Sequence, residues 1–142
     1  MRNIWRCAAL ALVAGCAPAA SEPAPAPEPT VVVAALDQPF TLSPGQSATV
    51  AGEALTLRFM EVANDSRCPT GVQCVWAGNA VVRAVLSKGG KGMGTELNTG
   101  QEPRSTPYLT YTVELAGLTP SPAPERPVPA ANYRATFVVR ER

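Results

Sequence analysis

The stretch richest in chemically useful side chains is residues 65–78, "DSRCPTGVQCVWAG", which holds Cys68 and Cys74. Their C-x5-C spacing differs from the C-x-x-C of thiol oxidoreductases, whose reactive thiolate depends on tight geometry at a helix N-terminus. A zinc or copper site needs three or four ligands. The chain has no histidine, and Met60 and Met93 are well separated from each other in sequence. We therefore expect neither redox catalysis nor a metal site.

The N-terminal sequence "MRNIWRCAALALVAGC" has the layout of an export signal, because a short cationic region with Arg2 and Arg6 precedes an apolar run over residues 7–14. This run is far shorter than the roughly 20 residues that a membrane-spanning helix needs. No later segment is long enough either. The sequence predicts an exported chain without a transmembrane helix, with residues 1–15 as the signal peptide.

The residues "VAGC", 13–16, resemble the lipobox of bacterial lipoproteins. The resemblance implies cleavage before Cys16, a diacylglyceryl group on its thiol and a third acyl chain on its amine, which together anchor a protein stably in a membrane. Ala17, in place of Asp, implies sorting to the outer membrane by precedent in Gram-negative lipoproteins. The alternatives are an ordinary secretory signal cleaved near Ala19 or Ala20, or a cysteine of the apolar run that has no role of its own.

The remaining cysteines are even in number once the signal is removed and Cys16 is acylated. In an oxidising compartment Cys68 and Cys74 are then expected to form a disulfide, with the turn between them supplied by residues 69–71, Pro-Thr-Gly. The loop is short, so the bridge is expected to shape it more than to hold the fold.

Three side chains around this loop could contact a ligand: Arg67, Thr70 and Trp76. Arg67 is expected to pair with Asp65 or another acid. We expect both the acid and Arg67 to support the loop structure rather than to contact a ligand. Trp76 follows the second cysteine, so we expect its indole to pack against the disulfide, as the core tryptophan does in sandwich domains. The alternative is a surface platform for a sugar or a peptide.

Catalysis is not expected from this composition. Without histidine, a serine or cysteine nucleophile lacks its usual general base. Paired carboxylates could still act, but nothing in the sequence brings two of the scattered acids together; they are Glu53, Glu61, Asp65, Glu96, Glu102 and Glu114. We predict a protein that is not an enzyme, with no catalytic residue and no cofactor.

Residues 16–30 are expected to form an extended tether between the lipidated cysteine and the folded part, because Pro alternates there with small or acidic residues. Residues 31–142 suffice for one modest core, so we expect a single domain and a monomer. The chain has twelve basic and eleven acidic residues, and removing Arg2 and Arg6 leaves ten and eleven. This near-neutral balance gives no basic patch for a nucleic acid.

Period-two alternation of apolar residues dominates the folded part, so the sequence predicts an all-β fold. Four segments place their apolar side chains on one face: 54–62 (Leu55, Leu57, Phe59), 79–87 (Ala80, Val82, Ala84, Leu86), 108–115 (Leu109, Tyr111, Val113, Leu115) and 133–142 (Tyr133, Ala135, Phe137, Val139). We expect about six to eight short antiparallel strands, in an Ig-like or Greek-key β-sandwich or a small barrel.

The connecting segments are predicted from their glycines and prolines. Pro44 and Gly45 mark a turn between two short strands within 38–50. Residues 87–96, "SKGGKGMGTE", are expected to be a mobile hairpin tip, or else a weak lysine contact with anionic lipid or lipopolysaccharide. The five prolines after Gly117 predict a long crossover between the last two strands.

The segment "DSRCPTGVQCVWAGNA", with the later "ELAGLTPSP" and "NYRATFVV", resembles a family of small bacterial envelope proteins with a D-S-R-C-P-x-x-V-x-C-x-W-x-G core. The resemblance spans about residues 40–139, implies a β-rich domain and carries no assigned activity. We expect an anchored, non-enzymatic binding or structural module for an envelope protein, glycan or lipid, using a sheet face or aromatics such as Trp76, Tyr108 and Tyr111. The alternative is an inhibitor of an envelope or foreign hydrolase that uses the closed loop 67–74.

Overall fold

The structure, a computed structural model, describes residues 31–142. The predicted signal peptide (1–15), the predicted lipidation site Cys16 and the predicted tether (16–30) therefore lie outside the described residues. Within 31–142 the first strand begins at Val31.

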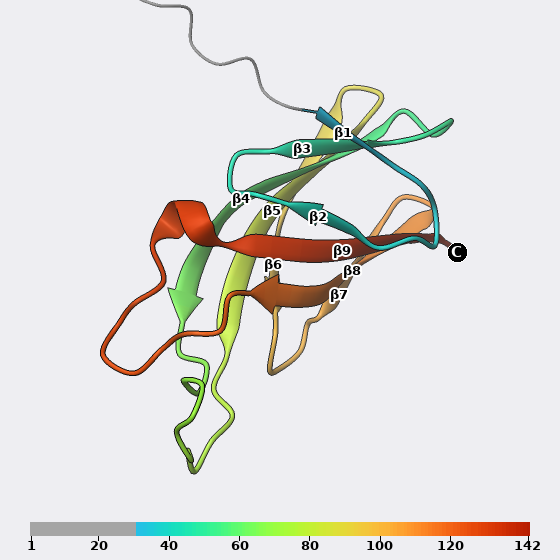
Figure 1. The fold of residues 1–142 in the computed structure, drawn as a ribbon. Helices are drawn as coiled ribbons and strands as arrows, with labels where there is room; N and C mark the ends of the chain where they lie inside the picture. The colour runs from blue at the N-terminus through green and yellow to red at the C-terminus, as the bar shows by residue number, and fades with distance from the viewer. Residues whose placement is uncertain (1–30) are drawn as a thin grey trace, which may run out of the picture.

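The described residues form nine strands in two sheets that pack face to face (Figure 1). The strands are β1 (Val31–Ala34), β2 (Phe40–Leu42), β3 (Ser47–Val50), β4 (Leu55–Asp65), β5 (Ala80–Lys88), β6 (Lys91–Asn98), β7 (Ser105–Tyr108), β8 (Tyr111–Thr119) and β9 (Arg134–Glu141), with a 3-10 turn η1 (Ala130–Asn132) before β9. One sheet has the order β1-β3-β4-β5-β6, and the other has the order β2-β9-β8-β7. The prediction of an all-β sandwich is confirmed.

The core lies between the sheets and follows the predicted alternation. The buried residues from the four predicted faces are Leu55, Leu57, Phe59, Ala80, Val82, Ala84, Leu86, Tyr111, Val113, Leu115, Tyr133, Ala135, Phe137 and Val139. Phe137 of β9 joins the two sheets, because its ring lies 6.1 Å from that of Phe59 in a T-shaped arrangement. Such edge-to-face pairs are the favoured geometry of aromatic rings.

Leu109 is the exception to the predicted faces. It lies in the turn between β7 and β8, with a φ of 55°, and its side chain is exposed. The predicted strand 108–115 is in fact the end of one strand, a two-residue turn and the start of the next, with Tyr108 paired to Tyr111. Because a turn interrupts the alternation, the prediction of one continuous strand over 108–115 is wrong.

Two features of the larger sheet differ from the sequence-based expectations of antiparallel strands and of a hairpin tip over residues 87–96. β1 pairs with β3 in parallel, with Val31 opposite Ser47. Most of the predicted hairpin tip 87–96 belongs to β5 and β6, and only Gly89 and Gly90 form the turn. Both glycines have positive φ, at 58° and 77°, as a two-residue hairpin turn with the twist of the strands requires.

The connections also correct one prediction. The Pro44–Gly45 turn does separate two short strands, and it carries the chain from β2 in one sheet to β3 in the other. The proline-rich segment after β8 is not a crossover, because β8 and β9 are hydrogen-bonded neighbours in the same sheet. It is a long loop beside the end of the sandwich. Its prolines keep it out of the sheet, as expected, but proline content does not determine which strands a loop joins.

β4 is the longest strand, with 11 residues, and it carries two irregularities in its pairing with β5. Such bulges increase the local twist of a strand. β4 and β5 lead into the loop that contains both cysteines, which Figure 1 shows projecting from the end of the sandwich.

Candidate functional site

The cysteine loop, residues 66–79, continues the β4–β5 hairpin beyond the sheets. The Ser66 N–H donates to the Asn79 carbonyl at 2.7 Å, and the Cys68 N–H donates to the Ala77 carbonyl at 3.0 Å. These backbone bonds give the loop a regular base, so its tip is held at a fixed distance from the sandwich.

Cys68 and Cys74 are joined by a disulfide, with their Cα atoms 5.9 Å apart. The predicted pairing is confirmed. Within the closed segment, the Thr70 N–H donates to the Pro122 carbonyl at 3.0 Å. The side chain of Thr70 stays exposed. The loop is therefore fastened both to itself and to the proline-rich connection between β8 and β9.

Arg67 forms the main link between the cysteine loop and the rest of the domain. Its guanidinium donates twice to the Asp65 carboxylate, at 2.8 and 2.7 Å. It also donates to the carbonyls of Leu118, at 2.6 Å, and Pro120, at 2.8 Å. The Tyr133 hydroxyl also donates to the Asp65 carboxylate, at 3.0 Å. The expected Arg67–Asp65 pair is confirmed, and Arg67 is only 13% exposed, which leaves little of it for a ligand.

The pKa of Asp65 is lowered in this network. Burial alone would raise it, but the hydrogen bonds from Arg67 and Tyr133 together outweigh that penalty. Burial, and then the bond to Asp65, raise the pKa of Tyr133. At neutral pH the network thus consists of a carboxylate, a guanidinium and a neutral phenol.

The base of the loop is packed too closely for side chains at two glycines. A Cβ on Gly78, whose φ is +72°, would lie 1.9 Å from the Ser66 carbonyl oxygen, and one on Gly100 would lie 2.2 Å from the Gly78 oxygen. The Asn79 side chain completes this base, since it accepts from the Gly100 N–H at 2.9 Å and donates to Asn98 at 2.8 Å. Only glycine fits at these two positions.

The tip of the loop is apolar and exposed. Trp76 is 81% exposed, Val75 is 90% exposed and Val72 is 45% exposed. The prediction that Trp76 packs against the disulfide is wrong, because the loop extends past both sheets and has no second layer to bury an indole. Trp76 instead corresponds to the alternative, a surface residue. Neither Val72 nor Val75 was singled out from the sequence, where nothing distinguishes them from core valines.

The two tyrosines named as candidate surface residues are buried. Tyr108 is 6% exposed and Tyr111 is 2% exposed, so their expected role as exposed aromatics is wrong. The Tyr108 hydroxyl accepts from the Lys88 N–H at 3.0 Å and donates to the Lys91 carbonyl at 2.5 Å, which fixes the β5–β6 hairpin. The structure therefore does not bring Tyr108 or Tyr111 together with Trp76 on one surface.

The Tyr111 hydroxyl lies between two charged groups. It donates to the Glu53 carboxylate and accepts from the Lys88 ammonium, which also lies 3.3 Å from Glu53. These contacts, that of Tyr111 first, lower the pKa of Glu53 and raise the pKa of Lys88. The charged forms of Glu53 and Lys88 are each favoured by their partners, so Glu53 is a carboxylate and Lys88 an ammonium at neutral pH.

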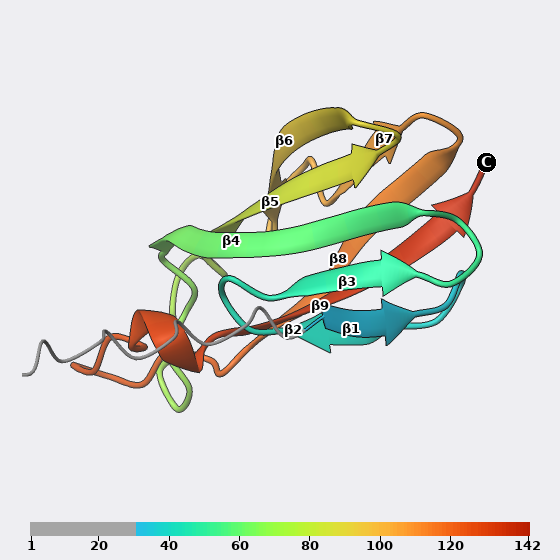
Figure 2. The same ribbon diagram turned by 90° about the horizontal axis from the view of Figure 1, so that it is seen from above.

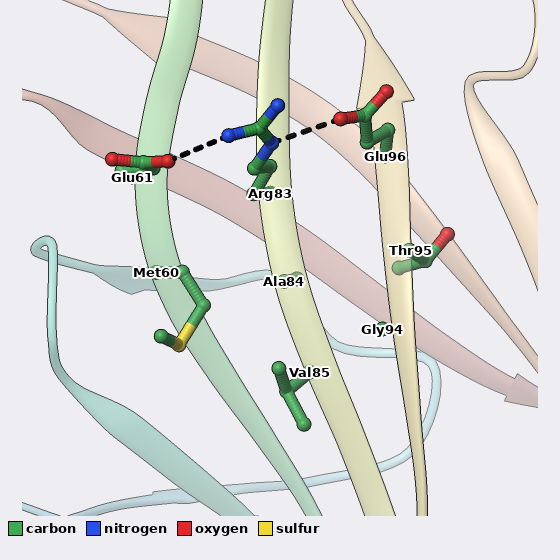
Figure 3. Close-up of a pocket in the computed structure, with 8 residues that line it drawn as sticks. All are labelled: Met60, Glu61, Arg83, Ala84, Val85, Gly94, Thr95 and Glu96. Carbon is green, nitrogen blue, oxygen red and sulfur yellow. Dashed lines mark hydrogen bonds and ion pairs between the residues drawn. The ribbon is translucent and has the colours of Figure 1, made fainter.

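A shallow hollow of about 500 Å³ lies on the outer face of β4, β5 and β6 (Figure 3). Arg83 spans its polar side and donates to Glu61 at 2.9 Å and to Glu96 at 2.8 Å. Sequence reasoning missed this arrangement, because Glu61 and Glu96 are distant along the chain and no local pattern brings them to one guanidinium. Val85 and Gly94 contribute to its apolar part.

Within residues 31–142 no three His, Cys, Asp or Glu side chains are grouped so that they could hold a metal ion. Within the same range no helix is long and apolar enough to cross a membrane. Comparisons of the chain with protein-family models, with curated proteins and with solved structures give no match.

Proposed function

We propose that this chain is an envelope lipoprotein, anchored in the outer membrane through Cys16, whose folded domain is a non-enzymatic binding module. The export signal and the lipobox-like "VAGC" support the anchoring. The absence of histidine and the saturated contacts of Glu53, Asp65 and Lys88 favour binding over catalysis.

One observation carries the proposal: an indole that is 81% exposed stands on a loop that is fixed by a disulfide, an ion pair and close backbone packing. Tryptophan is enriched among the residues that dominate binding energy at interfaces. A fixed loop lowers the ordering cost of binding. Residues 69–77 contain no charged side chain. We therefore expect the partner to be another envelope protein that presents an apolar surface to this loop.

The hydrolase inhibitor is the second candidate for the same loop, because a closed loop also suits an active-site cleft. The buried position of Arg67 weighs against it, since the basic side chain that would enter such a cleft is bound to Asp65 and two carbonyls. The binding module is therefore preferred.

The test is photocrosslinking in intact cells with a photoreactive residue at position 75, compared with the same residue at Thr110, which is exposed in the β7–β8 turn. Position 75 should give one dominant adduct, and Trp76→Ala should reduce its yield at least tenfold. Equal adducts from position 110, or none from position 75, would contradict the binding role. A captured hydrolase that loses activity on binding would favour the inhibitor.

Anchoring is tested separately with Cys16→Ser. This variant should lose incorporation of labelled fatty acid and leave the membrane fraction. Continued labelling would show that Cys16 is not the lipidated residue.

A further inference from the structure

The larger sheet has two open edges, β1 and β6, which Figure 2 shows on opposite sides of the molecule. β6 is unusual because Gly92 and Gly94 lie in its first half, without the positive φ that would call for glycine. Conformational freedom therefore does not explain them. Glycine inside a strand often marks a place where another backbone approaches closely.

The backbone groups of Gly92 and Gly94 face the open edge. A two-residue turn pairs Lys88 with Lys91, and the alternation of antiparallel bonds then directs every second residue from position 92 outward. By the same alternation the Asn98 N–H points away from β5, and it donates to the Pro103 carbonyl at 2.9 Å.

The side-chain positions of the same two glycines lie on the outer face. A Cβ on Gly94 would meet nothing within 4 Å, and a Cβ on Gly92 would meet only the Leu86 oxygen at 3.9 Å. Gly94 lies opposite Val85, whose outer surface is left uncovered in the hollow of Figure 3. The β6 edge is therefore open both to backbone pairing and to apolar side chains from an added strand.

β1 has the complementary form. Val31 and Val33 are 54% and 77% exposed, whereas Ala34 is buried. The Ala34 carbonyl accepts from the Ala51 N–H at 2.8 Å, on the inner side of the sheet edge. By alternation, the backbone groups of Val31 and Val33 face outward. Two exposed valines at one edge thus match two bare glycines at the other.

The strand directions also agree. β1 runs parallel to β3, and β3, β4, β5 and β6 alternate, so β6 runs opposite to β1. If a second copy is placed beside the first with its sheet continuing in the same sense, its β1 lies antiparallel to β6, and the outer faces of both sheets coincide. Antiparallel pairing is the slightly more stable arrangement.

We propose that β1 of one copy adds to β6 of the next, with Val33 opposite Gly92 and Val31 opposite Gly94. In this register both valines cover glycines, and Val31 covers Val85 in the hollow. Shifting the register by two residues would place Val31 against Glu96. The contact is head to tail and leaves a free β1 and a free β6 at the ends, so it generates open rows of copies. This assembly is proposed in place of the monomer that the sequence predicts.

The tether of the same chain is a poor occupant of β6, because its alternating prolines lack the N–H groups that strand pairing needs. β6 of a second copy is also a poor occupant, because glycine opposite glycine leaves the hollow empty. Val31 and Val33 of β1 supply backbone groups that pair with the open edge of β6, and they supply apolar side chains for the hollow.

The test uses the full chain with Val33→Cys and Gly92→Cys together, oxidised in the cell envelope and run on a non-reducing gel. Opposed hydrogen-bonded residues have Cα atoms about 5.5 Å apart, which suits a disulfide. The two positions are at opposite edges of one sheet and cannot link within a chain. The expected result is a ladder of oligomers that disappears on reduction.

The matched control pairs Val33→Cys with Ser121→Cys, on the exposed proline-rich loop, and should give background levels only. Adding Gly94→Lys to the first variant should reduce the ladder at least tenfold, because the new side chain occupies the space of Val31. A monomeric band, an equal ladder from the control, or adducts with a different protein would overturn the proposal. The binding loop is not part of this contact, so Trp76→Ala should leave the ladder unchanged.

Discussion

Replacing Arg67 by alanine tests how the cysteine loop is held. The substitution removes four hydrogen bonds, two to the Asp65 carboxylate and two to the carbonyls of Leu118 and Pro120. It leaves the Asp65 side chain, which is only 9% exposed, with the Tyr133 hydroxyl as its remaining side-chain donor. Breaking a buried ion pair in this way costs about 3–5 kcal/mol, and some water access at the 13% exposed arginine places the expected loss near 3 kcal/mol.

Urea denaturation, followed by circular dichroism, measures this loss. With a slope of about 1.5 kcal/mol per molar urea, a loss of 3 kcal/mol lowers the midpoint by about 2 M. The matched control is Arg83→Ala, which also breaks two ion pairs, but at a side chain that is 50% exposed and screened by water, so the expected loss of stability is much smaller. If the two variants lost equal stability, the burial argument would be refuted.

A double substitution separates the pair from its surroundings. Asp65→Asn with Arg67→Met removes both charges and should be less destabilised than Arg67→Ala, because no buried charge is left without its partner. A double variant that is less stable than Arg67→Ala would show that the two carbonyl contacts, rather than the ion pair, carry most of the stabilisation.

Three further outcomes follow from the same loop. Because the pKa of Asp65 is lowered from its ordinary 3.8, its stabilisation is present above that pH and lost as the pH falls through the lower folded-state value, so acid unfolding should be shallower in Asp65→Asn. Gly78→Ala, which combines overpacking with positive-φ strain, should cost about 3 kcal/mol by urea denaturation, whereas Gly117→Ala, with open space around it, should cost less than about 1 kcal/mol. Replacing Cys68 and Cys74 by alanine should cost roughly 2 kcal/mol in thermal unfolding, since the closed loop is short; a loss above about 4 kcal/mol would mean that the disulfide supports the core.

The sequence was informative about the sheets wherever apolar side chains alternate. The faces of β4, β5 and β9 were predictable because each strand has one side in the core. β6 was not, because Gly92 and Gly94 leave two of its eight positions without side chains and interrupt the alternation. The parallel pairing of β1 with β3 depends on contacts between segments that are distant along the chain, and no local pattern encodes it.

The candidate site was predictable in its covalent link and its ion pair, and not in its surface. Cysteine count and spacing are local facts, as is an acid two residues before an arginine. Whether an indole is buried depends on what lies above it, and the loop that carries Trp76 has no layer above it. For Tyr111 the signal was available, since the alternation that groups it with Val113 and Leu115 already conflicts with a surface role.

The contrast between the base and the tip of the cysteine loop bears on its purpose. Arg67 and Asp65 place charges where they are largely removed from water, and Gly78 tolerates no side chain, so the base is built for one conformation. The tip leaves Val75 and Trp76 in water, where full burial of either side chain would be favourable by about 1.5–3 kcal/mol. A loop that served stability alone would gain by turning the indole inward or by replacing it with a polar residue. A fixed base that holds an exposed indole away from the domain's own core is the arrangement expected when a second molecule completes the burial.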